Sequence, residues 1–172
     1  LQHLRLWCES SARSPVPTYL WGPPGAGKSH LLRAARTALL SRGATVGWLD
    51  ADAPPLQAFD ESWDAVLLDD VDRYSAEQQH TAFNWFVNAV APASGRPRAV
   101  LAAGALPPAD LQLREDLRTR LGWGHVFELH ALPESDARAV LRRAADARGL
   151  FLSDEVMDYV LGRFSRDLGS LV

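Results

Sequence analysis

Short apolar runs alternate with segments of helical periodicity over residues 18–130. The apolar runs predict five strands, at residues 18–21, 45–50, 65–69, 98–102 and 126–129. The segments between them predict three helices, at residues 28–41, 75–90 and roughly 110–120. Such alternation is typical of an α/β fold, in which helices cover both faces of a mainly parallel sheet.

Local signals at the ends of these segments agree with the pattern. Gly43 is placed to end the first helix, and Ser75 is placed to cap the second. Residues 65–68 are wholly apolar, as expected of a strand that is buried on both faces. The sequence therefore predicts a three-layer αβα arrangement for this part of the chain.

The composition changes after Pro133, where only helical patterns follow. Helices are predicted at residues 135–148 and 153–164, with Gly149 ending the first and Ser153 beginning the second. We therefore expect two units, a sheet domain over residues 1–130 and the start of a helical domain over residues 131–172. The chain begins without a methionine and ends inside a helical pattern, so both ends are expected to be truncated.

Composition narrows the class of protein. The chain has 172 residues, 47% of them apolar, a net charge of −3 and a pI near 5.9, so a surface that grips DNA strongly is not expected. Cys8 is the only cysteine, which excludes a disulfide framework and suits a reducing cytoplasm. No apolar run approaches the roughly 20 residues of a membrane span, and no signal peptide is evident.

The six tryptophans, at positions 7, 21, 48, 63, 85 and 123, are expected to lie in the core or half-buried against it.

Residues 22–29 carry the most informative chemistry, because they match the phosphate-binding pattern G-x-x-x-x-G-K-[ST] in full. The glycines let backbone N–H groups close around phosphate oxygens, Lys28 is placed to reach the terminal phosphates, and Ser29 offers a hydroxyl to Mg²⁺. A predicted strand precedes the loop and a predicted helix follows it, which places phosphates at a helix N-terminus.

Two acidic residues are candidates for the metal-binding and catalytic part of this nucleotide site. Asp69 and Asp70 follow the apolar strand at residues 65–68, and parallel strands end at the crevice where ligands bind. We expect Asp69 to hold Mg²⁺ opposite Ser29 and Asp70 to act as the general base that activates water. The alternative is a pair of solvated loop acids, and Asp72 is expected to be solvated or to cap a turn.

Hydrolysis of a nucleoside triphosphate also needs positive charge at the transition state, often from an arginine. Arg114, Arg118 and Arg120 precede the sequence Leu-Gly-Trp-Gly at residues 121–124. Their spacing singles out none of the three, and a solvated helix face accounts for at least two of them.

These motifs together resemble the AAA+ ATPases, and within them the DnaA/Hda family of bacterial replication proteins. The resemblance covers nearly the whole chain and is carried by residues 22–32, 66–72, 117–124 and 165–171. The phosphate loop is generic, whereas the Arg-Leu-Gly-Trp-Gly block at residues 120–124 is much more specific to this branch.

The resemblance implies roles for single residues. The ATP- or ADP-binding Walker A segment corresponds to Gly22, Pro23, Pro24, Gly25, Ala26, Gly27, Lys28, Ser29 and His30. Asp69 and Asp70 correspond to the Walker B acids that act with Mg²⁺. Arg120 matches the arginine finger, which acts on nucleotide held by a neighbouring subunit. Arg166 matches the sensor-II arginine of the helical lid, which contacts the chain's own nucleotide. By the same resemblance Leu4 or Trp7 is a candidate for lining the adenine pocket.

One position departs from the family pattern. The sensor-I strand usually ends in a polar residue, and the matching residue here is Ala105. Alanine forms no hydrogen bond to a γ-phosphate or to water, so we expect weak intrinsic ATPase activity and a role as regulator more than as a motor.

Residues 128–133 and the pair Pro107-Pro108 look closer to Hda than to DnaA. That resemblance implies regulatory inactivation of DnaA: with the DNA polymerase sliding clamp, such proteins stimulate hydrolysis of DnaA-bound ATP, and the clamp motif would precede Leu1. Homo-oligomerisation is also compatible with the family. The alternatives are the AAA+ core of the DnaA initiator itself, a helicase-loader-like ATPase, and a protein-interaction module that binds no nucleotide.

Overall fold

The computed structural model describes residues 16–54, 58–92, 95–131 and 133–163. Its elements in chain order are β1 (Thr18–Trp21), α2 (Lys28–Leu40), β2 (Val46–Leu49), β3 (Ala65–Leu68), the 3₁₀ turn η1 (Val71–Arg73), α3 (Ala76–Val90), β4 (Ala99–Gly104), the 3₁₀ turn η2 (Pro108–Asp110), α4 (Glu115–Leu121), β5 (His125–Glu128), α5 (Glu134–Asp146) and α6 (Asp154–Arg163). All five predicted strands are present.

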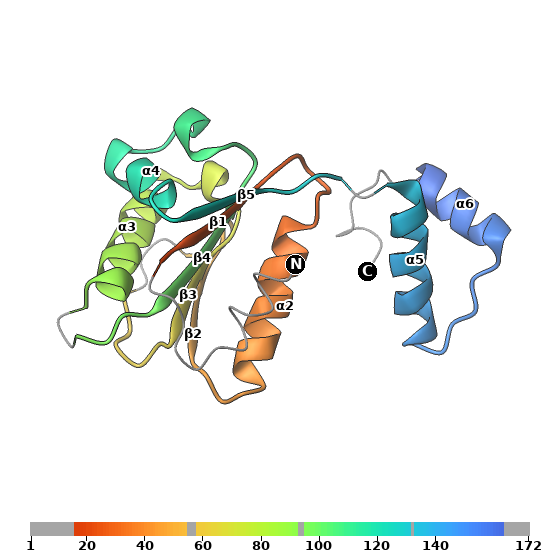
Figure 1. The fold of residues 1–172 in the computed structure, drawn as a ribbon, viewed down its shortest axis with the longest axis horizontal. Helices are drawn as coiled ribbons and strands as arrows, with labels where there is room; N and C mark the ends of the chain where they lie inside the picture. Colours follow the sequence, from red (N-terminus) through yellow and green to blue (C-terminus); the bar gives the residue numbers. More distant parts are fainter. Residues whose placement is uncertain (1–15, 55–57, 93–94, 132, 164–172) are drawn as a thin grey trace.

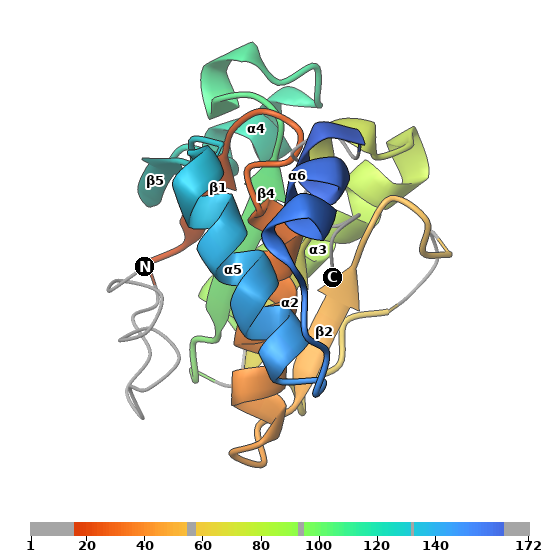
Figure 2. The same cartoon turned by 90° about the vertical axis from the view of Figure 1, so that its right-hand side faces the viewer.

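The strands form one parallel sheet in the order β2-β3-β4-β1-β5. Helix α2 covers one face of the sheet, whereas α3 and α4 cover the other (Figures 1 and 2). The predicted α/β class with a three-layer αβα arrangement is therefore confirmed. Because every strand runs the same way, the loops that follow β1, β3 and β4 all leave from one edge of the sheet.

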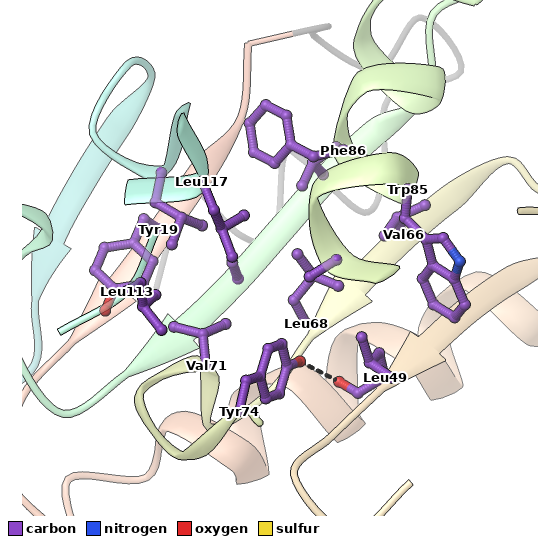
Figure 3. Close-up of a cluster of buried hydrophobic side chains, with 14 of the residues drawn as sticks. Tyr19, Leu49, Val66, Leu68, Val71, Tyr74, Trp85, Phe86, Leu113 and Leu117 are labelled. Carbon is purple, nitrogen blue, oxygen red and sulfur yellow. Dashed lines mark hydrogen bonds between the residues drawn. The ribbon is translucent and has the colours of Figure 1, made fainter. Parts of the chain in front are cut away.

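Side chains of the central strands alternate between the two faces, and each set packs under a different helix layer. Leu67 and Leu101 belong to the cluster under α2, whereas Val66, Leu68 and Val100 belong to the cluster under α3 and α4. Figure 3 shows the second cluster, in which the Trp85 and Phe86 side chains of α3 lie beside residues of the sheet. Burial on both faces is the reason that these strands read as continuous apolar runs.

The two boundary signals named for this domain act as expected. The hydroxyl of Ser75 accepts a hydrogen bond from the Gln78 N–H, and the Gln78 side chain accepts one from the Ser75 N–H, which forms a capping box at the start of α3. Gly43 follows α2 with a φ of 74°, a left-handed conformation that favours glycine.

The segment around β4 departs from the sequence expectation in two places. β4 continues to Gly104, two residues beyond the predicted end, because its last residues pair with Leu20 and Trp21 of β1. The third helix begins only at Glu115, since Pro107 and Pro108 direct the chain into the short turn η2 instead. At the end of β4, pairing with β1 outweighs the low strand propensity of alanine and glycine. After β4, the two prolines prevent an early start of the helix.

Two glycines allow β1 and β5 to approach closely at both ends. A Cβ atom on Gly22 would lie 2.1 Å from the carbonyl oxygen of Leu129, and one on Gly124 would lie 2.0 Å from that of Pro17. The Leu129 N–H also donates to the Trp21 carbonyl at 2.7 Å. The first residue of the phosphate loop is therefore in direct contact with the backbone that follows β5.

Helices α5 and α6 form a separate pair that stands apart from the sheet on the side of α2 (Figure 1). Met157 of α6 is buried, as are Ala137, Leu141 and Ala145 of α5. The Arg142 guanidinium donates to the Asp154 carboxylate across the pair at 2.8 Å. Within the described residues no helix is long and apolar enough to cross a membrane.

The expectation that every tryptophan packs into or against the core is wrong for Trp123, which is 66% exposed. It follows Gly122, where α4 ends, so its side chain lies beyond the face of the helix that packs on α3. Trp85 is fully buried, and Trp7 lies outside the described residues.

Candidate functional site

The phosphate loop connects the end of β1 to the start of α2, as the sequence predicted. Gly25 and Gly27 have φ angles of 80° and 88°, a conformation that a side chain would strain. Gly27 occupies the cap position of α2 and offers no side-chain cap, so the first N–H groups of this 13-residue helix are left to an external acceptor. Phosphate oxygens are the acceptors that such a helix start favours.

The Lys28 side chain folds back over the loop that precedes it. Its ammonium donates to the carbonyl oxygen of Gly22 at 2.7 Å and to that of Pro23 at 3.0 Å. Lys28 is buried. A desolvated ammonium interacts strongly with a phosphate oxygen, because the surrounding dielectric is low. The arrangement thus supplies a fixed positive charge at the loop.

Ser29 and Asp69 lie side by side, although 40 residues separate them in the sequence. The Ser29 hydroxyl donates to Oδ1 of Asp69 at 3.1 Å. A hydroxyl oxygen and a carboxylate oxygen are hard donors of the kind that Mg²⁺ prefers, and this cation usually completes its shell with phosphate oxygens and water. The residues therefore fit a Mg²⁺ ion held together with a nucleotide.

Burial is the main influence on the Asp69 carboxyl and raises its pKa. The hydrogen bond from Ser29 opposes this shift, and the negative charge of Asp70 adds to it. Because the folded-state pKa lies above the unfolded value, the ionised carboxylate costs free energy in the fold at neutral pH. This cost disappears as the pH falls through the folded-state pKa.

Asp69→Asn is accordingly expected to stabilise the nucleotide-free protein by about 1 kcal/mol near neutral pH, since it removes a buried charge. The same substitution is expected to remove the contribution of Mg²⁺ to nucleotide binding. Thermal unfolding with and without nucleotide, each with Mg²⁺ or with a chelator, measures both effects. If nucleotide binding by the variant depended on Mg²⁺ as it does in the parent protein, Asp69 would not be a metal ligand.

Asp70 adopts a left-handed backbone conformation, with a φ of 51°, which costs a non-glycine residue about 1 kcal/mol. Its N–H donates to Oδ1 of Asp69 at 3.1 Å, and its carboxylate lies 3.5 Å from a guanidinium nitrogen of Arg73. Strained conformations of this kind cluster at functional sites. The Asp70 side chain is partly exposed, and its role as general base stays a prediction.

Asp72 was expected to be solvated or to cap a turn, but it also accepts a hydrogen bond from a distant part of the chain. Its side chain is exposed, yet Oδ1 accepts a hydrogen bond from the Ala105 N–H at 2.7 Å. Ala105 follows β4 at the same sheet edge as the two acids, and it offers no polar side-chain atom there. Local pattern held no signal for this contact, because 33 residues separate its two partners.

The three arginines near α4 differ in their surroundings. Arg114 forms two 2.7 Å hydrogen bonds with the Asp116 carboxylate, whereas no carboxylate in the described part of the chain pairs with Arg120. The Arg120 guanidinium lies 5.2 Å from the centre of the Phe83 ring, and Arg118 lines a surface groove of about 440 Å³. Among the described residues, the surroundings separate Arg114, which Asp116 neutralises, from Arg118 and Arg120, which have no carboxylate partner.

The remaining predicted residues fall in different places. Pro23, Pro24 and His30 are exposed on or beside the loop. Arg166 lies outside the described residues, as does Leu4. The structure thus brings together the loop, Ser29 and Asp69, and it places Arg120 on a helix that packs on the opposite face of the sheet from α2 (Figure 1).

Comparison with known proteins adds three findings of structure. The fold is similar to domain III of the replication initiation protein DnaA from Thermotoga maritima, with a TM-score of 0.78, 19% identity, and coverage of 99% of this chain and 77% of that one. AMPPCP-bound DnaA from Aquifex aeolicus has a TM-score of 0.67 and 23% identity, over 99% of this chain and 57% of that one. The RuvB Holliday junction branch migration motor of Thermotoga maritima has a TM-score of 0.61 and 17% identity, over 92% of this chain and 53% of that one.

A family model describing the lid domain of Hda matches residues 134–172. The parallel sheet, its phosphate loop and the structural likenesses show that the chain has the fold of an AAA+ P-loop domain. Residues 134–172 are thus similar to the lid domain of Hda, and the fold as a whole is similar to that of DnaA. The chain spans little more than half of the Aquifex and RuvB chains.

Proposed function

We propose that this chain is the nucleotide-binding part of a regulator of replication initiation, which stimulates hydrolysis of DnaA-bound ATP together with the sliding clamp. The observation that carries the proposal is the contrast between two positions. Ala105 offers no polar side-chain atom to a γ-phosphate on this chain, whereas Arg120 presents a guanidinium that no described carboxylate neutralises. A protein built in this way is better suited to act on a partner's nucleotide than on its own.

The nucleotide held by this chain is ADP or ATP with Mg²⁺. The fixed ammonium of Lys28 and the open start of α2 suit the phosphates, and the pair Ser29 and Asp69 suits the cation. DnaA from Aquifex aeolicus is described as bound to AMPPCP, an adenine nucleotide analogue, which supports this choice. Intrinsic hydrolysis is expected to be weak, because position 105 lacks a group that orients water.

The division of labour follows from the two proposed units. Residues 1–130 form the nucleotide-binding domain, and residues 131–172 begin a lid whose Arg166 contacts the bound phosphates. Arg120 acts in trans on ATP held by DnaA, as an arginine finger does. The clamp binds through a motif before Leu1. The protein acts in the cytoplasm without gripping DNA strongly itself, and it can associate with further copies of itself.

The proposal is tested with the full-length protein. Loaded with ADP, it is expected to raise the rate at which DnaA hydrolyses ATP on DNA that carries the clamp. Protein without nucleotide, and DNA without the clamp, serve as controls and are expected to stimulate poorly. Equal ATP turnover by DnaA with and without the ADP-loaded protein would rule out the proposed function.

The leading alternative is that the chain is the AAA+ core of the initiator itself. The likeness to DnaA over 99% of this chain favours it, and the acidic composition speaks against a strongly DNA-binding protein. The length of the full gene beyond Val172 distinguishes the regulator from the initiator. A short extension that completes the lid indicates the regulator, and a longer one with a basic helix-turn-helix indicates the initiator. A helicase-loader-like ATPase would instead act on the replicative helicase.

A further inference from the structure

Asp72 joins two parts of the sheet domain that lie 33 residues apart in the sequence. It belongs to η1, the turn that directly follows Asp69 and Asp70, and its carboxylate accepts the N–H of Ala105 at 2.7 Å. Ala105 in turn directly follows β4. A single charge-assisted hydrogen bond therefore connects the turn that carries the site acids to the loop between β4 and η2.

A second bond holds the same loop from β1. The hydroxyl of Tyr19 donates to the Leu106 carbonyl at 2.8 Å. Burial, and to a lesser degree the charge of Asp72, raise the pKa of Tyr19, so this hydroxyl keeps its proton and remains a donor. A Cβ on Gly104 would lie 2.4 Å from the Tyr19 hydroxyl and 3.0 Å from Oδ1 of Asp72, so the two bonds depend on the missing side chain of that glycine.

The loop held by these two bonds leads directly to the helix that carries Arg120. It continues through Pro107 into η2, which packs against α4. Pro107 and Pro108 line the same surface groove as Arg118 of α4. The position of residues 104–106 therefore sets where η2 lies, and η2 in turn supports α4.

We propose that Asp72 is a positioning residue for Arg120. It fixes the β4–η2 loop, and through η2 the helix α4, relative to the turn that carries Asp70. The polar side chain expected at position 105 is absent, and Asp72 binds the backbone of that position instead. A change at the nucleotide acids thus reaches the helix that faces a partner. The inference rests on the role proposed above for Arg120 in trans.

Hydrogen exchange of the full-length protein tests the structural half of this inference. Asp72→Ala removes the acceptor and is expected to speed exchange of residues 105–121 by about tenfold. Asp72→Asn keeps an oxygen that accepts the Ala105 N–H and is expected to restore most of the protection. Asp110→Ala, which removes an exposed acid of η2 itself, is the matched control and is expected to change little. Unchanged exchange of α4 in Asp72→Ala would overturn the inference.

Stimulation of DnaA-bound ATP hydrolysis tests the functional half, with Arg120→Ala measured in parallel. Asp72→Ala is expected to lower the maximal stimulated rate about tenfold, with little change in the half-saturating concentration or in affinity for ADP, and Asp72→Asn is expected to recover most of the rate. A parent-like maximal rate in Asp72→Ala would overturn the inference. If the parent protein fails to stimulate at all, the proposed function fails, and exchange of α4 alone then decides the positioning role.

Discussion

Arg120→Ala is expected to reduce the stimulation of DnaA-bound ATP hydrolysis by about a thousandfold, the lower end of the range for loss of an arginine finger. The reason is the role proposed for the guanidinium, which no described carboxylate neutralises and which lies near the Phe83 ring. Because α4 and the phosphate loop lie on different parts of the sheet domain, binding of ADP by the variant is expected to be unchanged. Single-turnover hydrolysis of DnaA-bound ATP measures the first effect, and calorimetry with ADP measures the second.

Arg118→Ala is the matched control, because it removes an equal charge from the same helix. Arg118 lines the groove beside η2, so its loss is expected to weaken partner binding slightly and to leave the maximal rate near that of the parent. Arg120→Lys is expected to behave like Arg120→Ala, since an ammonium does not reproduce the planar fork of a guanidinium. Equal maximal rates for the parent and Arg120→Ala would exclude the finger role.

Lys28→Ala is expected to weaken binding of ADP and ATP by about a hundredfold, because the loop loses its fixed charge. Calorimetry against each nucleotide measures the change. Arg36→Ala on the exposed side of the same helix is the control and is expected to bind as the parent does. Undiminished binding by Lys28→Ala would support the reading of residues 22–29 as a purely structural turn.

The composition of the chain allows a second measurement of the same charge without mutation. Lys28 is the only lysine in the sequence. An amine-directed reagent therefore has a single side-chain target in this chain, and ADP is expected to slow its modification. Mass spectrometry of the labelled peptide, with and without nucleotide, follows the protection directly.

Elements that depend on local pattern were predictable to within a residue or two. Residues 65–68 are apolar because both helix layers cover that strand, and burial on two faces leaves a plain signal in the sequence. The capping box at Ser75 is equally local, since both of its hydrogen bonds join residues three apart. Lys28 and Ser29 followed from a motif whose spacing is set by the loop itself.

Features that depend on contacts across the fold were not predictable from the sequence. The sequence interpretation gave Asp72 a solvent or capping role, because its partner Ala105 becomes a neighbour only once β3 and β4 pair. Trp123 was expected against the core, since side-chain type carries no information about the end of the short helix before it. Spacing likewise left the three arginines equivalent, and only their surroundings separate Arg120 from Arg114.

The contact between Gly22 and Leu129 gives the first glycine of the phosphate loop two independent duties. A methyl group at position 22 would collide with the backbone after β5 before it met any phosphate. Loss of nucleotide binding in a Gly22 variant is therefore ambiguous, because the collision alone can displace the loop. The same contact anchors the segment that leads to α5 as far as Leu129. A swing of the helix pair in response to nucleotide would therefore hinge after Leu129, beside the phosphate loop that Leu129 contacts.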